Sequence, residues 1–261
     1  MNNNKSARRH LPDADAVIRQ ATSLIEKGGL FTVLGDNNAA LASYDRAIET
    51  CRPLSGKVDK VAVLLSQALD NKGSVLLDLG RPADTILAFE QAIHIYSDNV
   101  RGEGNDYDAQ EIAISIMNCG RAYMLLGRFD EAKEYLERAV TAFDAIGSPE
   151  NLALAIVNLG DLYFHQGDLK ESLTMLQRSV EIWESISPFW PDTHKYEFAY
   201  ALFAKADVLF RLGFYDEALE SLGRCAKILG AIVEITNQTS DRHDLADAME
   251  LRDKILAKVN G

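Results

Sequence analysis

The sequence predicts an all-α protein, a right-handed α-solenoid of five antiparallel helix pairs followed by a C-terminal capping helix. Three features predict it: a recurring glycine, small residues at fixed distances from that glycine, and apolar residues at helical spacing on both sides of it. Successive glycines of the series lie 40 to 47 residues apart, which is room for one helix pair. The five glycines are Gly35, Gly80, Gly127, Gly167 and Gly213.

Small residues occupy the same three places in every unit. They stand seven positions before each glycine, five after it and twelve after it, and a larger apolar residue stands nine after it. The small positions hold Gly28, Gly73, Gly120, Gly160 and Ala206, then Ala40, Thr85, Ala132, Ser172 and Ala218, then Ala47, Ala92, Ala139, Ser179 and Cys225. The larger residues are Tyr44, Phe89, Leu136, Leu176 and Leu222.

This pattern has a direct physical interpretation. Apolar residues at spacings of three, four and seven on both sides of the glycine mark two amphipathic helices. The glycine stands where the first helix ends, in a left-handed C-cap that a residue with a Cβ atom resists. Small residues let the paired helices approach closely, and the larger residue fills the neighbouring gap.

The period and the residue pattern resemble the tetratricopeptide repeat. The third unit, Asn118 to Ala132 (Asn-Cys-Gly-Arg-Ala-Tyr-Met-Leu-Leu-Gly-Arg-Phe-Asp-Glu-Ala), is nearly a copy of that family's consensus. The repeat is longer than the ~34 residues usual in the family, and the proline that usually ends the second helix is absent. Both features are similar to long-repeat members, such as those of kinesin light chains and of bacterial peptide-sensing regulators.

The expected boundaries follow from the repeat. Residues 1–10 lack periodicity and are predicted to be disordered, with the first helix beginning near Pro12 and Asp13. Five repeats are expected over residues 11–236, in units of about 11–52, 57–98, 108–147, 150–187 and 194–236. Residues 98–108 and 187–195 are predicted loops, and residues 240–261 are the predicted cap that seals the last core.

The charge balance excludes some classes of partner. The chain has 27 Lys and Arg residues against 39 Asp and Glu residues, a formal net charge of −12. This charge argues against binding to nucleic acid or to an anionic membrane surface, because both require a basic face. The polar start lacks the apolar run of a signal peptide, and no stretch approaches the ~18 apolar residues of a membrane span. We therefore expect a cytoplasmic protein without membrane insertion or a nucleic-acid partner.

No catalytic, cofactor or metal motif emerges from the sequence. It lacks a phosphate-binding loop, a GxGxxG turn, HExxH and CxxC, and no two of its five histidines share metal-ligand spacing. The three cysteines, Cys51, Cys119 and Cys225, are odd in number and widely spaced, which fits buried thiols better than disulfides. The prediction is a non-catalytic protein that needs no cofactor and no metal.

Asparagine recurs nine positions before the glycine in three consecutive units, as Asn71, Asn118 and Asn158, whereas Glu26 and Ala204 take that place in the first and fifth units. The resemblance implies that this position points into a concave groove lined by the first helices of the pairs. There an asparagine amide can pair with a peptide bond through its donor and its acceptor. Hydrogen bonding between the protein's own helices is the alternative interpretation.

Other residues are expected on the same face. Their mixture of aromatic, methionine and charged side chains is typical of peptide-binding surfaces. They are Ser74, Arg121, Met124, Asp161, Phe164, His165, Asp207, Phe210 and Arg211. For Phe164 and Phe210, the alternative to contact with a ligand is packing against the next repeat.

The predicted function is that of a protein-interaction adaptor that binds an extended peptide or partner segment in the concave groove. Two alternatives stay open. One is a self-assembling structural scaffold, for which the aromatic Phe189 and Trp190 form a second candidate surface. The other is a peptide-sensing regulatory module that acts with a separate effector chain. Both a monomer and a homo-oligomer are compatible with the sequence.

Overall fold

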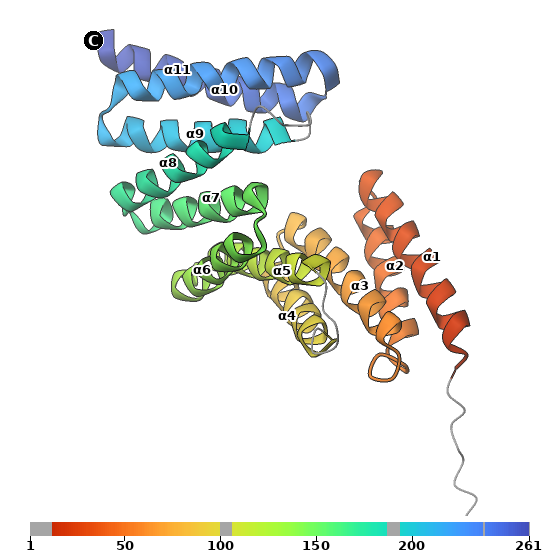
Figure 1. Cartoon of the computed structure of the whole chain (residues 1–261). Helices are drawn as coiled ribbons and strands as arrows, with labels where there is room; N and C mark the ends of the chain where they lie inside the picture. Colours follow the sequence, from red (N-terminus) through yellow and green to blue (C-terminus); the bar gives the residue numbers. More distant parts are fainter. Residues whose placement is uncertain (1–11, 100–105, 187–193, 237, 261) are drawn as a thin grey trace, which may run out of the picture. The chain divides into compact units, whose positions relative to one another are not determined.

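The computed structural model describes residues 12–99, 106–186, 194–236 and 238–260. All regular structure in these residues is helical, so the predicted all-α class is confirmed (Figure 1). The eleven helices of the described chain are α1 (Ala14–Val33), α2 (Asn37–Cys51), α3 (Asp59–Asp78), α4 (Pro82–Asn99), α5 (Asp106–Leu125), α6 (Phe129–Ile146), α7 (Pro149–Gln166), α8 (Leu169–Ile186), α9 (Lys195–Leu212), α10 (Tyr215–Thr236) and α11 (Thr239–Asn260).

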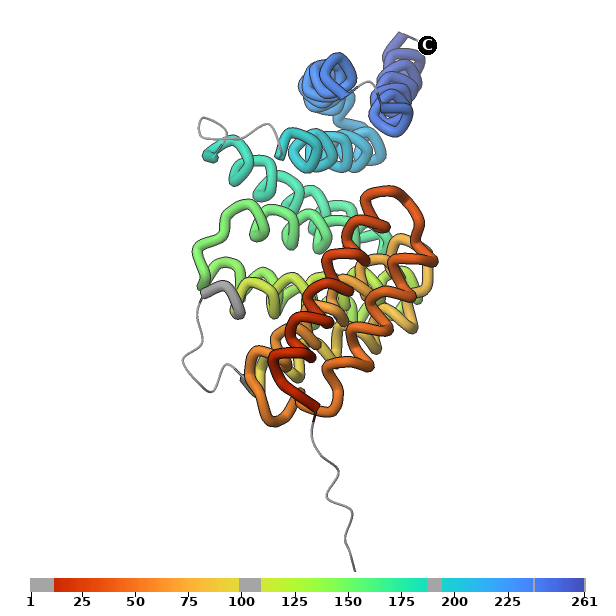
Figure 2. Tube along the Cα trace, turned by 90° about the vertical axis from the view of Figure 1, so that its right-hand side faces the viewer, coloured from red at the N-terminus to blue at the C-terminus, as the bar shows by residue number. Residues whose placement is uncertain are grey.

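The chain divides into two compact units, Met1–Gly127 and Arg128–Gly261. In the first unit α1 packs against α2 and α3 packs against α4, while α3 also contacts α1 and α5. In the second unit α7 packs against α8 and α9 packs against α10, while α9 also contacts α7 and α11. In both units the first helices of successive pairs are therefore neighbours, as the helix-pair prediction requires (Figures 1 and 2).

The recurring glycines end the first helices in the expected conformation. All five have positive φ, between 65° and 87°. At the end of α7, Gly167 has φ 87° and its N–H bonds the carbonyl of Phe164, while the N–H of Asp168 reaches the carbonyl of Tyr163 at 2.9 Å. This pair of bonds satisfies carbonyls that the helix end leaves without partners.

The predicted packing positions are buried in each of the five repeats. The small residues before and after the turn glycines are all buried, and the five larger residues between them are each at most 2% exposed. A Cβ atom on Gly73 would lie 2.9 Å from the ring of Phe89, and one on Gly160 would lie 2.8 Å from Cγ of Leu176. The larger residue of the second helix therefore fills the space that the glycine of the first helix leaves.

The last helix completes the core of the second unit. Ala248 and Ile255 of α11 are 1% and 0% exposed, and they belong to the same core cluster as Cys225 and Leu229 of α10. The rest of α11 is largely exposed. This is the one-sided burial expected of a helix that covers the end of an array.

The predicted loop over residues 98–108 is wrong at both ends. Helix α4 continues to Asn99 and α5 already begins at Asp106. The turn-rich composition of this stretch concealed both helix ends. At the N-terminal end, Asp13 caps α1 by accepting from the N–H of Asp15. Residues 1–10 lie outside the described residues.

The three cysteines, Cys51, Cys119 and Cys225, are free and buried, as predicted. None of the helices described here is both long and apolar enough to cross a membrane.

Candidate functional site

The candidate site lies on the face that α7 and α9 share in the second unit. A pocket of about 190 Å³ opens between these helices, with α8 behind it. We call it the α7–α9 pocket. Its lining includes Asp161, Phe164, His165, Tyr200, Ala204 and Asp207. Four of these residues, all but Tyr200 and Ala204, were predicted groove residues.

Polar contacts join the two helices across this pocket. The hydroxyl of Tyr200 on α9 donates to Oδ2 of Asp161 on α7 at 2.7 Å. The guanidinium of Arg211 on α9 lies 4.4 Å from the ring centre of Phe164 on α7, and its Nε donates to Oδ2 of Asp207 at 3.3 Å. The pocket therefore combines two carboxylates, a phenol and an aromatic ring, and the guanidinium of Arg211 lies beside it against Phe164.

Tyr200 is a polar pocket residue that sequence analysis missed. It lies seven positions before Asp207 and four before Ala204, so all three share one face of α9. Extending the predicted face by two helical turns toward the start of α9 would have found it. Its side chain is 45% exposed, which is unusual for so large an aromatic residue and leaves its ring open to a ligand.

The other predicted residues of the second unit lie close by. Asn158 is half-buried on α7 and precedes Asp161 by three residues, so both side chains lie on the same helix face. Phe210 is half-buried and packs beside Tyr215, with ring centres 6.0 Å apart, and it does not line the pocket. Phe189 and Trp190 lie outside the described residues.

The predicted residues of the first unit lie on α3 and α5. Asn118 is only 8% exposed, and its Oδ1 accepts from Nη1 of Arg121 at 3.3 Å. Asn71 is half-buried and Ser74 is exposed on α3, while Met124 is half-buried on α5. Asn118 therefore already has a partner within the protein, which distinguishes it from an amide that faces a ligand.

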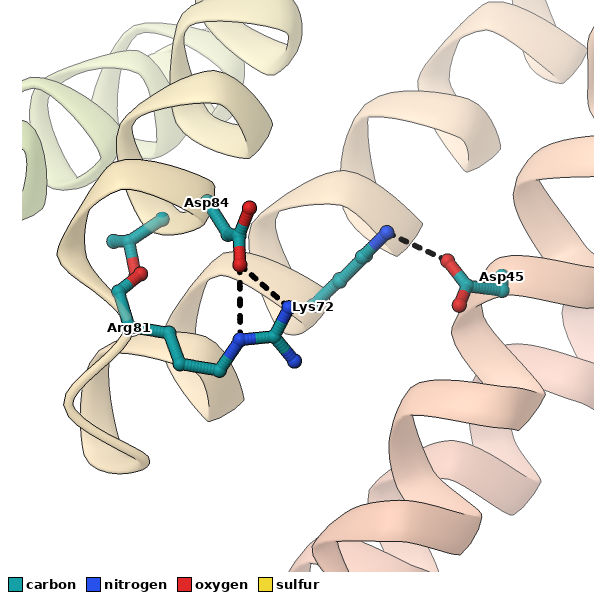
Figure 3. A network of polar contacts seen from close by, with 5 residues as sticks. Asp45, Lys72, Arg81 and Asp84 are labelled. Carbon is teal, nitrogen blue, oxygen red and sulfur yellow. Dashed lines mark hydrogen bonds and ion pairs between the residues drawn. The ribbon is translucent and has the colours of Figure 1, made fainter.

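A larger cavity of about 400 Å³ lies over α2, α3 and α4 in the first unit. Figure 3 shows its polar contacts: Lys72 Nζ donates to Asp45 Oδ1 at 2.6 Å, and Arg81 Nε donates to Asp84 Oδ2 at 2.9 Å. Because these charges are paired with each other, they give the cavity no preference for a ligand of either sign. Such exposed pairs contribute about 0–1 kcal/mol each. The Lys72–Asp45 pair links α3 to α2 at the surface, and the Arg81–Asp84 pair lies at the start of α4.

A family model matches part of the chain. Residues 111–185 match the family model of the tetratricopeptide repeat. This segment contains tetratricopeptide repeats. The matched repeats include most of α7 and α8, and with them the α7 side of the pocket. No curated protein matches the sequence closely enough to count as a relative.

Several solved structures share this tetratricopeptide-repeat fold. BtubC (BKLC) from P. vanneervenii aligns with a TM-score of 0.68 at 19% identity, over 84% of each chain. Nearly identical TPR-like repeats assigned to a kinesin light chain of Podosopora anserina align with a TM-score of 0.62 at 17% identity, over 84% of this chain and 98% of that one. A Rap protein in complex with competence and sporulation factor aligns with a TM-score of 0.65 at 16% identity, over 92% of this chain and 66% of that one. At these identities the similarity concerns the fold.

Proposed function

We propose that this protein is a non-catalytic interaction scaffold that binds an extended peptide segment of a partner at the α7–α9 pocket. The observation that supports the proposal is the composition of the pocket lining. It places Phe164, the exposed phenol of Tyr200 and the carboxylates of Asp161 and Asp207 on two neighbouring helices. A peptide needs such a mixture, because its backbone requires donors and acceptors while its side chains require apolar contact.

The size of the pocket favours a peptide over a compact small molecule. Pockets that enclose a drug-sized molecule have volumes of about 300–1,000 Å³, whereas this pocket has about 190 Å³. A volume of this size suits one anchoring side chain, and the rest of the ligand would lie along the helices. Asn158 lies one turn from Asp161, and in this proposal its amide pairs with a peptide bond of that ligand.

The tetratricopeptide repeats support a role in protein interaction. A Rap protein of similar fold has been solved in complex with competence and sporulation factor, so this fold can hold a ligand.

Filling the pocket tests the proposal. Peptides of twelve residues would be selected from a phage-displayed library on the wild-type protein, and their affinities measured by fluorescence anisotropy. Ala204→Leu is expected to weaken the selected peptides at least tenfold, because the added atoms occupy the pocket that Ala204 lines. Ala231→Leu is the matched control, since Ala231 is exposed on α10 and lies outside the pocket. Peptides that bind Ala204→Leu as tightly as the wild type would contradict the proposal.

Self-assembly is a second candidate, favoured by one observation. At the end of α1 and in the turn that follows, Leu30, Val33 and Leu34 are 67%, 86% and 77% exposed. Adjacent exposed apolar side chains of this kind are typical of contact surfaces. If a second copy covers this patch, light scattering should give the mass of a dimer or larger assembly, and Val33→Lys should reduce it to the mass of one chain. A wild-type protein that is monomeric at high concentration would exclude this candidate.

A further inference from the structure

A second pocket lies directly beside the α7–α9 pocket. It has a volume of about 260 Å³ and is formed by α9, α10 and α11. We call it the α9–α11 pocket. Its lining includes Tyr196, Tyr200, Phe203, Asp244 and Asp247, with the buried Cys225 and Leu229 behind them. Tyr200 and Phe203 line both pockets, so a ligand can extend from one to the other without leaving the protein surface.

Aromatic rings form the open wall of the α9–α11 pocket. Tyr196 is 43% exposed, nearly as much as Tyr200, so both rings present considerable apolar surface to solvent. Their hydroxyls are held by carboxylates. Tyr196 donates to Oδ2 of Asp244 at 2.7 Å, as Tyr200 does to Asp161. The two rings are therefore fixed by one bond each and do not need to be ordered when a ligand arrives.

The electrostatic character of this pocket is negative. Asp244 and Asp247 line it, and none of the described lining residues is cationic. On α11, Nε2 of His243 lies 4.0 Å from Oδ2 of Asp247, and Nζ of Lys254 contacts Oε1 of Glu250 at 2.7 Å.

Two groups beside Asp244 have raised pKa values, for which burial is the largest cause and the carboxylate a further one. Burial, the hydrogen bond to Asp244 and the charge of that carboxylate raise the pKa of Tyr196 to about 12. Burial, with a smaller contribution from Asp244, raises the pKa of the Cys225 thiol to about 12.

We propose that the α9–α11 pocket binds a cationic side chain, the guanidinium or ammonium group of an arginine or lysine in the partner segment. Aromatic rings beside carboxylates attract a cation through two additive effects, the quadrupole of the rings and the charge of the carboxylates. An anionic group would be repelled by Asp244 and Asp247, and a neutral apolar group would gain nothing from them. The net charge of −12 also attracts a cationic partner segment while it is still approaching the protein. The inference rests on the proposed function, because it names the chemistry of one residue of the peptide that the scaffold binds.

The test uses a single-residue probe, so that it does not depend on a peptide in the α7–α9 pocket. Acetyl-arginine amide would be titrated into the full chain labelled with ¹³C in its tyrosine rings, with acetyl-citrulline amide as the neutral probe of the same shape. The signals of Tyr196 and Tyr200 would be assigned from Tyr→Phe variants. We expect the arginine probe to shift both signals in a saturable manner, with an affinity at least threefold higher than that of the citrulline probe. Equal shifts with both probes, or no shift with the arginine probe, would overturn the inference.

A pair of variants on one helix localises the effect. Asp247→Asn removes a carboxylate of the pocket, while Asp253→Asn makes the same change at an exposed position of α11, where the carboxylate contacts Arg252 outside the pocket. Asp247→Asn should weaken the arginine probe at least threefold, and Asp253→Asn should leave it unchanged. If both variants weaken the probe equally, the effect comes from the general acidity of the protein and the pocket is not the site.

The failure of this inference can be distinguished from the failure of the proposed function. Library peptides that lose affinity for Ala204→Leu but show no enrichment in arginine or lysine would support the α7–α9 pocket and overturn the cation site. Conversely, a specific shift by the arginine probe without any selected peptide would support the cation site and count against the peptide scaffold.

Discussion

The ring of Tyr44 on α2 lies against the backbone of Gly28 on α1. A Cβ atom on Gly28 would lie 2.4 Å from Cε1 of this ring, which is far inside van der Waals contact. Tyr44 is 2% exposed, and its hydroxyl lies 3.3 Å from Oγ1 of Thr32, one turn further along α1. The first helix pair therefore packs closely because residue 28 has no side chain.

Adjacent glycines of α1 test this packing. Gly28→Ala should lower the free energy of unfolding by about 1–3 kcal/mol, because overpacking outweighs the gain of about 1 kcal/mol in helix propensity. Gly29→Ala should instead raise it by about 0.5–1 kcal/mol, since no atom lies within 4 Å of a Cβ there. Urea denaturation of the two variants measures both changes. Equal stabilisation by both variants would show that the ring of Tyr44 adapts at little cost.

Helix α11 offers a second matched pair. Ile255 is fully buried in the core of the second unit, whereas its neighbour Leu256 is 37% exposed. Ile255→Ala should destabilise the unit by about 2–4 kcal/mol through the cavity it leaves, and Leu256→Ala by less than about 1 kcal/mol. Thermal denaturation followed by circular dichroism would compare them. An unchanged melting temperature for Ile255→Ala would mean that α11 is an appendage of the fold.

Asp70 on α3 should make stability depend on pH. Burial, with a contribution from Glu111, raises the pKa of this carboxyl from 3.8 to about 7, although Ser115 and Tyr96 act in the opposite direction. Between these two values the folded state holds a proton that the unfolded state has released, so this group's contribution to stability falls as pH rises from about 4 to about 7 and is constant above.

Asp70→Asn isolates that contribution, because asparagine is neutral in both states. The stability of the variant relative to the wild type should increase from pH 4 to pH 7 and level off above. At about 1.4 kcal/mol per pKa unit the increase is at most about 4 kcal/mol. Chemical denaturation at intervals of one pH unit measures it. A difference that stays constant from pH 4 to pH 8 would contradict the assignment.

The sequence predicted the parts of the fold that depend on local spacing. The left-handed turn at Gly167 and the contact of Gly160 with Leu176 both lie within one helix pair, so a fixed distance along the chain specifies them. Asp161, Phe164 and Asp207 were predicted separately for the same reason, from the repeat in each helix.

Contacts between repeats could not be predicted in the same way. The bond between Tyr200 and Asp161 joins residues 39 apart, and the bond between Ser115 and Asp70 joins residues 45 apart. Both depend on how one helix pair stacks on the next, which the length of the intervening helices and loops controls and which a residue pattern does not reveal. The carboxylates of α11 at the second pocket were missed because that helix was interpreted as a cap alone.

The asparagines at equivalent positions should behave differently from each other. Asn118 is 8% exposed and accepts from Arg121, so Asn118→Ala should cost about 0.5–1.5 kcal/mol of stability and leave peptide binding at the α7–α9 pocket unchanged. Urea denaturation and anisotropy on the same preparation give both quantities. A stable variant with weakened binding would place Asn118 in the ligand site after all.

The central claim, that the face of α7 and α9 binds the peptide, is tested most directly by the affinity and melting temperature of Asn158→Ala. Its half-buried amide lies one turn from Asp161, so its loss should remove one hydrogen bond to a selected peptide. At about 0.5–1.5 kcal/mol, this weakens binding about 2- to 12-fold. The melting temperature should not change. Asn151→Ala, the same substitution near the start of α7, where the amide donates to Ser148, should leave the affinity unaltered. A lower melting temperature for Asn158→Ala, with normal peptide affinity of the folded protein, would contradict the claim.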